Sequence, residues 1–259
     1  PMSSTPAVPR VPSRFFYGWL IVIVAMLGLF VSGAGQSHTF SVFLGPVSAE
    51  LGLTQTQWGF AYGFATLIAA LGLPFMGRLT DRFGPKRMLL IVAVLLGFAC
   101  LAFGAIAGAL GIGLAFAALR FLGQGSLALN CANLVSRWFD RKRGFALGLM
   151  ALGFSMSMAI HPPLAQWLID QVGWREAWLW MGLSTWLLML PVVWFFVYNR
   201  PHDVGLMPDG TAPASAEVVT ASAVAKAPVL SGLTRAQALR TSAFYIICGG
   251  LLSLSMLVT

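Results

Sequence analysis

Six long apolar runs are the feature of this 259-residue sequence that most limits what it can fold into. They lie at about 17–40, 58–76, 88–108, 111–136, 144–168 and 178–198. Each run is near or above the roughly 20 residues that an α-helix needs to cross the hydrocarbon core of a bilayer. With 58% hydrophobic residues and only 9% charged residues, the composition is typical of an all-α polytopic membrane protein and unlike that of a soluble domain.

Most charged residues lie in short segments between these runs. The segment Gly77–Arg87, G-R-L-T-D-R-F-G-P-K-R, holds four basic residues and one aspartate, and 137–143 holds four basic residues against Asp140. Burying such charges in lipid costs several kcal/mol each, so both segments are expected to be loops on the cytoplasmic side, with a cytoplasmic N-terminus. The net charge of +8 therefore indicates topology, and no nucleic-acid partner is expected.

Composition divides the chain into four parts. Residues 1–16 are expected to be a cytoplasmic tail, 17–198 a bundle of six transmembrane helices, 199–240 a Pro-containing cytoplasmic linker, and 241–259 the start of a seventh span. The end of the linker, 234–240, is expected to form a short amphipathic helix. The three cysteines lie in apolar runs without metal-ligand spacing, so neither a disulfide nor a metal nor another cofactor is expected.

The segment between the second and third runs resembles the loop between helices 2 and 3 of the major facilitator superfamily. The match lies at Gly77, Asp81, Arg82, Gly84, Lys86 and Arg87, while Pro85 departs from the family pattern. This resemblance implies a twelve-span transporter of which the chain is the first half, the missing C-terminal half being its partner. It further implies a cytoplasmic gate in which Asp81 meets a helix of the second half, Arg82 and Lys86 pair with carboxylates, and Asp140 and Arg141 take part.

Further motifs are similar to the monocarboxylate porter branch of that superfamily and its bacterial relatives. They are Tyr17-Gly18-Trp19, the stretch from Arg143 to Gly153, Gly173-Trp174-Arg175 and Asn199-Arg200-Pro201. The resemblance implies proton-coupled uptake of a small monocarboxylate through the inner membrane of a bacterium. Exchange of another organic or inorganic anion, or drug efflux, remains an alternative, although the fifth run lacks the G-x-x-x-G-P-x-x-G-G pattern of drug antiporters.

Polar groups inside the apolar runs are the candidates for a substrate and proton pathway. Arg120 lies about nine residues into the fourth run, and its guanidinium suits a carboxylate. Gln124 shares its helical face, whereas Asn130 lies on a second polar stripe about a third of a turn away, which suits either ligand contact or helix packing. His38 and His161 titrate in the range that proton coupling requires, although each also suits a satisfied interfacial histidine.

Two other function classes were weighed against transport. A membrane-embedded enzyme is not expected, because the sequence has no H-E-x-x-H motif and no G-x-S-x-G nucleophile elbow. A sensor without transport activity would keep the fold, but it would not need Arg120 and the other polar groups that line the spans.

Overall fold

The computed structural model describes residues 16–106, 108–210, 237, 240–246 and 248–250, and every regular element among them is a helix. The longer helices are α1 (Gly18–Val31), α2 (Ser37–Leu51), α3 (Gln55–Phe83), α4 (Pro85–Ala105), α5 (Ala109–Leu119), α6 (Ala128–Trp138) and α7 (Arg143–Phe196). Four shorter ones are η1 (Ser32–Gly35), η2 (Arg120–Leu127), η3 (Pro201–Val204) and η4 (Pro208–Gly210). The predicted all-α polytopic fold is confirmed.

The chain divides into two compact units, residues 1–213 and 214–259. In the second unit, 242–246 and 248–250 are helical, and the predicted amphipathic helix at 234–240 lies mostly outside the described residues. The first twelve residues of the expected linker, 199–210, contain η3 and η4 and belong to the first unit.

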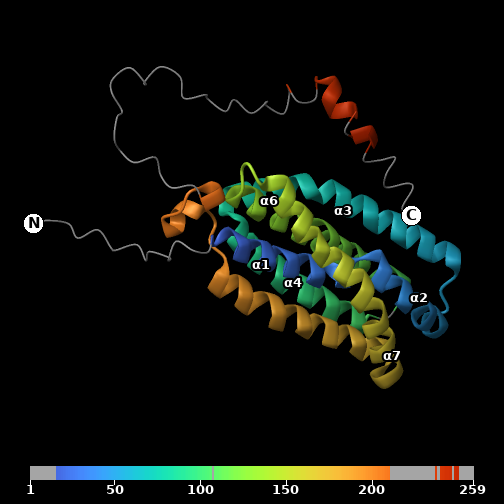
Figure 1. Ribbon diagram of the computed structural model, residues 1–259. Helices are drawn as coiled ribbons and strands as arrows, with labels where there is room; N and C mark the ends of the chain where they lie inside the picture. Colours follow the sequence, from blue (N-terminus) through green and yellow to red (C-terminus); the bar gives the residue numbers. More distant parts are fainter. Residues whose placement is uncertain (1–15, 107, 211–236, 238–239, 247, 251–259) are drawn as a thin grey trace, which may run out of the picture. The chain divides into compact units, whose positions relative to one another are not determined.

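Within the described part of the chain, five helices are long and apolar enough to cross a membrane. The last of them, α7, consists of two helices joined at Gly173. At 1.5 Å per residue, the 54 residues of α7 would extend about 80 Å, far beyond a hydrocarbon core of about 30 Å. Gly173 interrupts it with φ 82° and ψ 162°, a conformation suited to glycine, and the chain reverses there, as Figure 1 shows. All six apolar runs are therefore helical.

The segment Gly77–Arg87 is not the loop that its charge predicts. Helix α3 continues to Phe83, Gly84 alone breaks it with φ 83°, and Pro85 occupies the first turn of α4. A charged segment can stay helical here because a helix satisfies its own backbone hydrogen bonds while the charged side chains near its end extend into water. The basic segment is thus a sharp corner between two helices.

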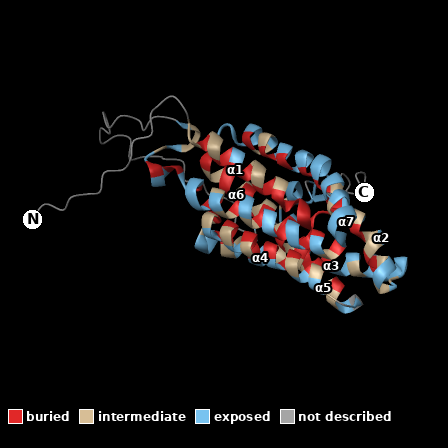
Figure 2. Cartoon of the chain, turned by 90° about the horizontal axis from the view of Figure 1, so that it is seen from below, coloured by how far each residue is buried: buried red, intermediate tan, exposed pale blue. Residues whose placement is uncertain are grey.

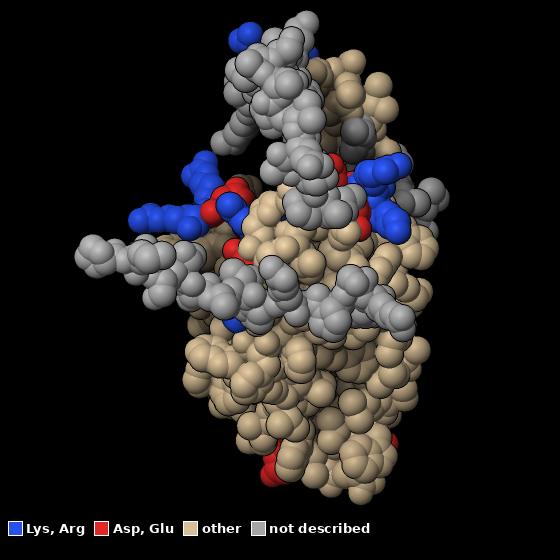
Figure 3. All heavy atoms as spheres, turned by 60° about the vertical axis from the view of Figure 1, so that its left-hand side comes forward, with Lys and Arg blue, Asp and Glu red and all other residues tan. Residues whose placement is uncertain are grey.

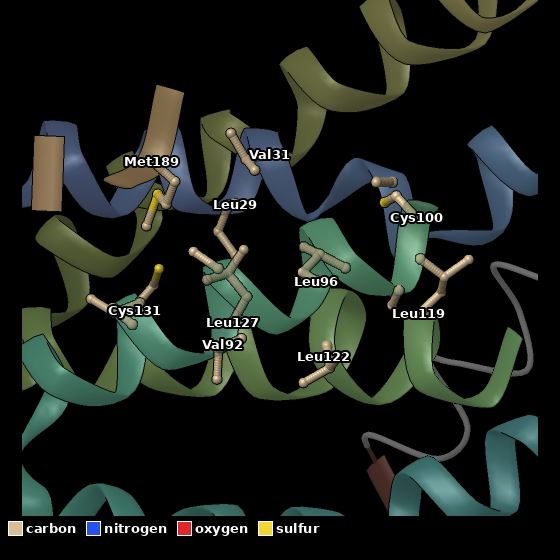
Figure 4. Packing of buried hydrophobic residues seen from close by; sticks show 14 of the residues in the cluster. Leu29, Val31, Val92, Leu96, Cys100, Leu119, Leu122, Leu127, Cys131 and Met189 are labelled. Carbon is tan, nitrogen blue, oxygen red and sulfur yellow. The ribbon is translucent and has the colours of Figure 1, made fainter. Parts of the chain in front are cut away.

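The core lies around α1 and α4, and α3 and α7 lie at the periphery. In their most apolar windows, 67% of the span 18–51 is buried, against 17% for α3 and 28% for α7 (Figure 2). Cys131, Met189 and Leu29 meet in this core (Figure 4), and Cys100 and Cys131 are buried free thiols. Close approach depends on glycine: a Cβ on Gly153 would overlap the Met26 carbonyl of α1.

Most of the Lys and Arg side chains visible in Figure 3 gather toward one end, whereas acidic side chains are visible at the opposite end. We call this the basic end; it holds Arg78, Arg82, Lys86, Arg87, Arg137 and residues 141–143.

At the other end, a cluster of hydrogen bonds around Arg175 joins three helices. Arg175 donates to Glu50 Oε1 at 2.8 and 3.0 Å and to the carbonyls of Gly104 and Ile106 at 3.0 and 2.9 Å. Trp174 Nε1 donates to the second carboxylate oxygen of Glu50. The G-W-R motif therefore joins α2, α4 and α7.

Candidate functional site

The first span is broken near its middle. Residues 32–35, S-G-A-G, form the 3-10 turn η1, Gln36 is extended (φ −93°, ψ 153°), and α2 starts at Ser37. The Ser32 hydroxyl donates to the Leu29 carbonyl, and Gln36 Nε2 donates to the Ser32 hydroxyl. A broken helix in a membrane is tolerated where it is packed by protein or lines a cavity. The break gives α2 its own N-terminus inside the bundle.

The fourth span is irregular at the same place. Residues 120–127 form a π-helix, η2, between α5 and α6. Gly123 packs on Gly35 of the broken first span: a Cβ built on Gly123 would lie 2.9 Å from Gly35 Cα. Two irregular segments thus meet backbone to backbone, which larger residues would prevent. Such π segments occur frequently at functional sites.

Arg120 begins the π-helix, and its side chain is buried, with 4% of the residue exposed. Its Nη1 donates to Ser37 Oγ at 2.8 Å, and the guanidinium lies 4.5 Å from the Tyr62 ring centre and 5.7 Å from that of Phe116. The Tyr62 hydroxyl lies 2.9 Å from Ser37 Oγ. The ion pairs among the described residues involve other arginines, so Arg120 is a buried cation with aromatic and hydroxyl neighbours but no carboxylate.

A pocket of about 280 Å³ opens beside Arg120. Its lining joins η2 to α3 and consists of Arg120, Gln124, Gly125, Thr66, Ala69, Ala70 and Leu73. Gln124 is exposed and lines this pocket together with Arg120. A larger groove of about 440 Å³ lies along α7 near Trp167 and Trp180, but no charged side chain lines it. The small pocket is therefore the better candidate for an anion.

Asn130 is engaged within the protein. It is fully buried; its Oδ1 lies 2.8 Å from the Thr80 hydroxyl, and its Nδ2 donates to the Ser126 carbonyl at 2.7 Å. Arg137 Nε likewise donates to Asn133 on the same helix at 2.8 Å. These bonds favour the packing role for the second polar stripe, joining α6 to α3, over ligand contact.

The two predicted histidines are brought together by a residue that the sequence did not single out. His38 Nε2 lies 3.1 Å from Ser157 Oγ, and the same oxygen lies 3.2 Å from His161 Nδ1. Ser157 is fully buried, His161 is 8% exposed, and His38 is half-buried. Ser157 and His161 are four residues apart on α7, which places them on one helical face, but only the tertiary fold adds His38.

At the basic end, the residues of the predicted gate make several contacts within the chain. Lys86 Nζ donates to the Trp194 carbonyl at 2.9 Å and lies 5.5 Å from the Tyr198 ring. Arg82 lies over the Phe83 ring. Asp81 is exposed and lies 3.9 Å from Arg137, a loose pair. Arg87 is exposed, and a Cβ on Gly77 would meet nothing within 4 Å among the described residues.

Asp209 was not among the predicted site residues, and it fastens the start of the linker. Its carboxylate accepts from the backbone N–H groups of Asp140, Arg141 and Lys142 at 3.1, 2.7 and 3.2 Å. Partial burial alone would raise the pKa of Asp209, but these hydrogen bonds and the nearby charge of Lys142 outweigh it and lower the pKa. Asp209 itself has φ 60°, and Gly210 follows with φ 70°. Asp140 and Arg141 are thus joined to the linker through their backbone.

The family model described as Major Facilitator Superfamily matches residues 19–259. The chain is 30% identical to the probable sulfoacetate transporter SauU of Cupriavidus necator over 60% of the chain and 36% of that protein. It is 28% identical to the oxalate:formate antiporter of Oxalobacter formigenes, over 74% of the chain and 44% of that protein.

A third relative is the cis,cis-muconate transport protein of Acinetobacter baylyi, 33% identical over 61% of the chain and 38% of that protein. The chain thus spans less than half the length of these relatives. The names of the relatives are those of transporters, not of enzymes, and each names an organic anion.

Proposed function

The chain belongs to the Major Facilitator Superfamily and is an integral, multi-pass membrane protein, and from this premise we propose that the full-length protein is a secondary active transporter of small organic anions. It works by alternating access, with the substrate bound near the middle of the membrane between two halves. The chain described here supplies the first half of that site.

The observation that carries this proposal is the unpaired guanidinium of Arg120. A buried charge in a membrane protein is costly unless a partner compensates it, and the described residues offer Arg120 one hydroxyl and two aromatic rings. A carboxylate in the pocket of about 280 Å³ would supply the missing charge through a planar, two-point contact. The N-terminus of α2, which starts at Ser37, adds a positive dipole end on the same side.

For the substrate class, we favour a small monocarboxylate carried together with a proton. One arginine matches one carboxylate, and the sequence motifs resemble the monocarboxylate porter branch. Proton transfer then falls to His38 and His161, which lie beside the broken span. Exchange of two anions is the second candidate, because one of the relatives is named as an antiporter.

The orientation follows from charge. We place the basic end, and with it the N-terminus, on the cytoplasmic side of a bacterial inner membrane. There the corner at Gly84, with Asp81, Arg82 and Lys86, serves as a gate against the second half of the protein. The exposed position of Asp81 supports this role, since its carboxylate is open to a partner helix.

The test is uptake by the full-length protein in liposomes. The labelled compounds are lactate, pyruvate, formate, oxalate, sulfoacetate and cis,cis-muconate, each offered with an inward proton gradient, without one, and with the same anion preloaded. We expect at least one of them to accumulate. Uptake that follows the gradient supports proton coupling, and uptake that requires preloading supports exchange.

Arg120→Gln removes the charge and keeps a polar side chain. Because a hydrogen bond to a charged group contributes about 1.5–3 kcal/mol, we expect affinity to fall by about 10- to 100-fold. Arg120→Lys keeps the charge without the planar fork and should retain part of the affinity. The matched control is Arg78→Gln, an exposed arginine at the basic end. Equal uptake by Arg120→Gln and wild type, in folded protein, would refute the anion site.

A further inference from the structure

Resting on the proposed transport function, we propose that His38, Ser157 and His161 form a single proton-binding relay that joins the first span to the fifth. The two oxygen–nitrogen distances, 3.1 Å from His38 Nε2 and 3.2 Å from His161 Nδ1, are hydrogen-bond distances to one shared hydroxyl.

The chemistry of a hydroxyl makes the three groups act together. Ser157 has one hydrogen to donate, so with neutral rings it donates to one histidine and accepts from the other. Two arrangements exist. In one, His38 Nε2–H donates to Ser157, and the Ser157 hydroxyl donates to His161 Nδ1. In the other, every donor and acceptor is reversed. The relay is therefore polarised, and its two states differ in the tautomer of each ring and in the direction of the Ser157 hydroxyl.

Passing a proton converts one state into the other. A proton from water binds His38 at Nδ1; the hydrogen on His38 Nε2 moves to Ser157 Oγ, and the original Ser157 hydrogen moves to His161 Nδ1. His38 and Ser157 each gain and lose one hydrogen and end neutral, while His161 gains one and becomes the imidazolium. The net result is one proton moved from the half-buried ring to the buried ring. Release of the Nε2 hydrogen of His161 as a proton then makes this ring neutral and completes the change to the second arrangement. Return of both ring tautomers and of the hydroxyl resets the chain.

The surroundings favour a shared proton over two charges. The Phe30 ring lies 4.8 Å from the His161 ring and the Phe154 ring 5.7 Å from the His38 ring, so both imidazoles lie among aromatic groups. Two imidazolium ions in so apolar a place would repel each other, and we expect the pair to hold one proton at a time. Among the described residues, Arg120 and Tyr62 reach the relay most directly, because both bond Ser37, next to His38. Glu50 on α2 and Arg175 on α7 bond each other at the far end of these helices.

A glycine leaves the space that the side chains of the relay occupy. Gly33, in the break of the first span, faces both Ser157 and His161; a Cβ there would clash with Ser157 Oγ and lie 2.7 Å from His161 Nδ1. The buried stripe of α7 on this side, which includes Gly153, Ser157, His161 and Ala165, is the stripe that packs on the first span. A tilt of α7 against α1 would therefore make or break the relay. Because Arg120 bonds the residue before His38, the anion site and the relay share the first turn of α2.

The first experiment uses the proton alone as the probe. Full-length protein labelled with ¹⁵N-histidine reports by NMR which ring nitrogens carry hydrogen, with assignment from His38→Gln and His161→Gln. We expect one of the two nitrogens that face Ser157 to be protonated and the other bare, and Ser157→Ala to abolish this complementarity. Both nitrogens bare, or an unchanged pattern in Ser157→Ala, would overturn the relay.

The second experiment measures coupling in liposomes. The substrate is the anion of the panel above that the wild type exchanges fastest. We expect Ser157→Ala to reduce the gradient-driven uptake of this anion about 100-fold. Counterflow of the same anion at equal pH should be retained. Ser157→Thr keeps the hydroxyl and should restore coupling. Ser155→Ala, an exposed serine two residues away on α7, is the matched control and should behave as wild type.

The outcomes separate the two proposals. Counterflow in the wild type with no response to a proton gradient would leave anion transport standing and overturn the relay. Full gradient-driven uptake by Ser157→Ala would do the same. If no anion of the panel moves even by counterflow, the proposed transport of these anions fails, and the NMR pattern alone then decides the relay.

Discussion

Replacing Gly153 by alanine tests how the first span packs on the fifth. Gly153 lies on the buried stripe of α7, and a Cβ built there would overlap the Met26 carbonyl oxygen and lie 2.8 Å from Met26 C and 3.0 Å from Met26 Cα. These are backbone atoms of α1, so no side-chain rotation can make room. The two helices must separate by a few tenths of an ångström or more.

The cost can be estimated from this geometry. Overpacking a well-packed interface costs typically 1–3 kcal/mol, and a backbone obstacle places Gly153→Ala at the upper end, about 3 kcal/mol. Alanine is the better helix former by about 1 kcal/mol, which offsets part of that cost. We therefore expect a net loss of about 2 kcal/mol in the free energy of unfolding.

Gly148→Ala is the matched control on the same helix. Gly148 is exposed, and a Cβ there meets nothing within 4 Å, so only the gain in helix propensity remains. The two variants should thus differ by about 3 kcal/mol. The assay is thermal unfolding of the full-length protein in detergent, followed by the fraction that remains monodisperse. Equal melting temperatures for Gly153→Ala and Gly148→Ala would refute close packing of α1 on α7 at this position.

Three further predictions follow from contacts away from the relay. Thr80→Val should cost about 1–2 kcal/mol of stability, because it leaves the buried Asn130 Oδ1 without its donor, and Thr80→Ser should restore it; chemical unfolding of both variants decides this. Arg175→Lys should lower the melting temperature through loss of its two carbonyl contacts at the end of α4, with a cost of about 1–2 kcal/mol, and a variant as stable as wild type would contradict the cluster. Asp209→Asn should speed hydrogen exchange at the amides of 140–142. Since the pKa of Asp209 is lowered in the folded protein, its ionised carboxylate contributes fully to the free energy of unfolding above the ordinary carboxyl range. This contribution is lost as pH falls through the lowered pKa, so the stabilities of wild type and variant should become equal in acid.

The sequence predicted the membrane-spanning character, the apolar runs and the separation of charged ends, because hydropathy and charge are properties of composition along the chain. It also singled out Arg120, because burying a charged side chain in an apolar run costs free energy unless a partner compensates the charge. It failed at the corner Gly77–Arg87, where charge indicated that the segment leaves the membrane but not that it stays helical as far as Phe83.

Hydropathy did not predict the irregular segments. The run S-G-A-G at 32–35 and the pair Gly123 and Gly125 are visible signals of close backbone approach, but periodicity assigns both stretches to continuous helix. The contacts of Asp209 could not be predicted from the sequence, because its partners are backbone amides that any residues could supply.

What the sequence determined by itself is therefore that the chain spans a membrane, which segments are basic, and that one arginine lies inside an apolar run. What only the tertiary structure decided is which polar groups meet. His38 and Ser157 are 119 residues apart, and their bond exists because the first span breaks at η1 and packs on α7. Local patterns fix how each segment responds to lipid and water, whereas contacts between distant side chains depend on helix packing and on the small residues that allow it.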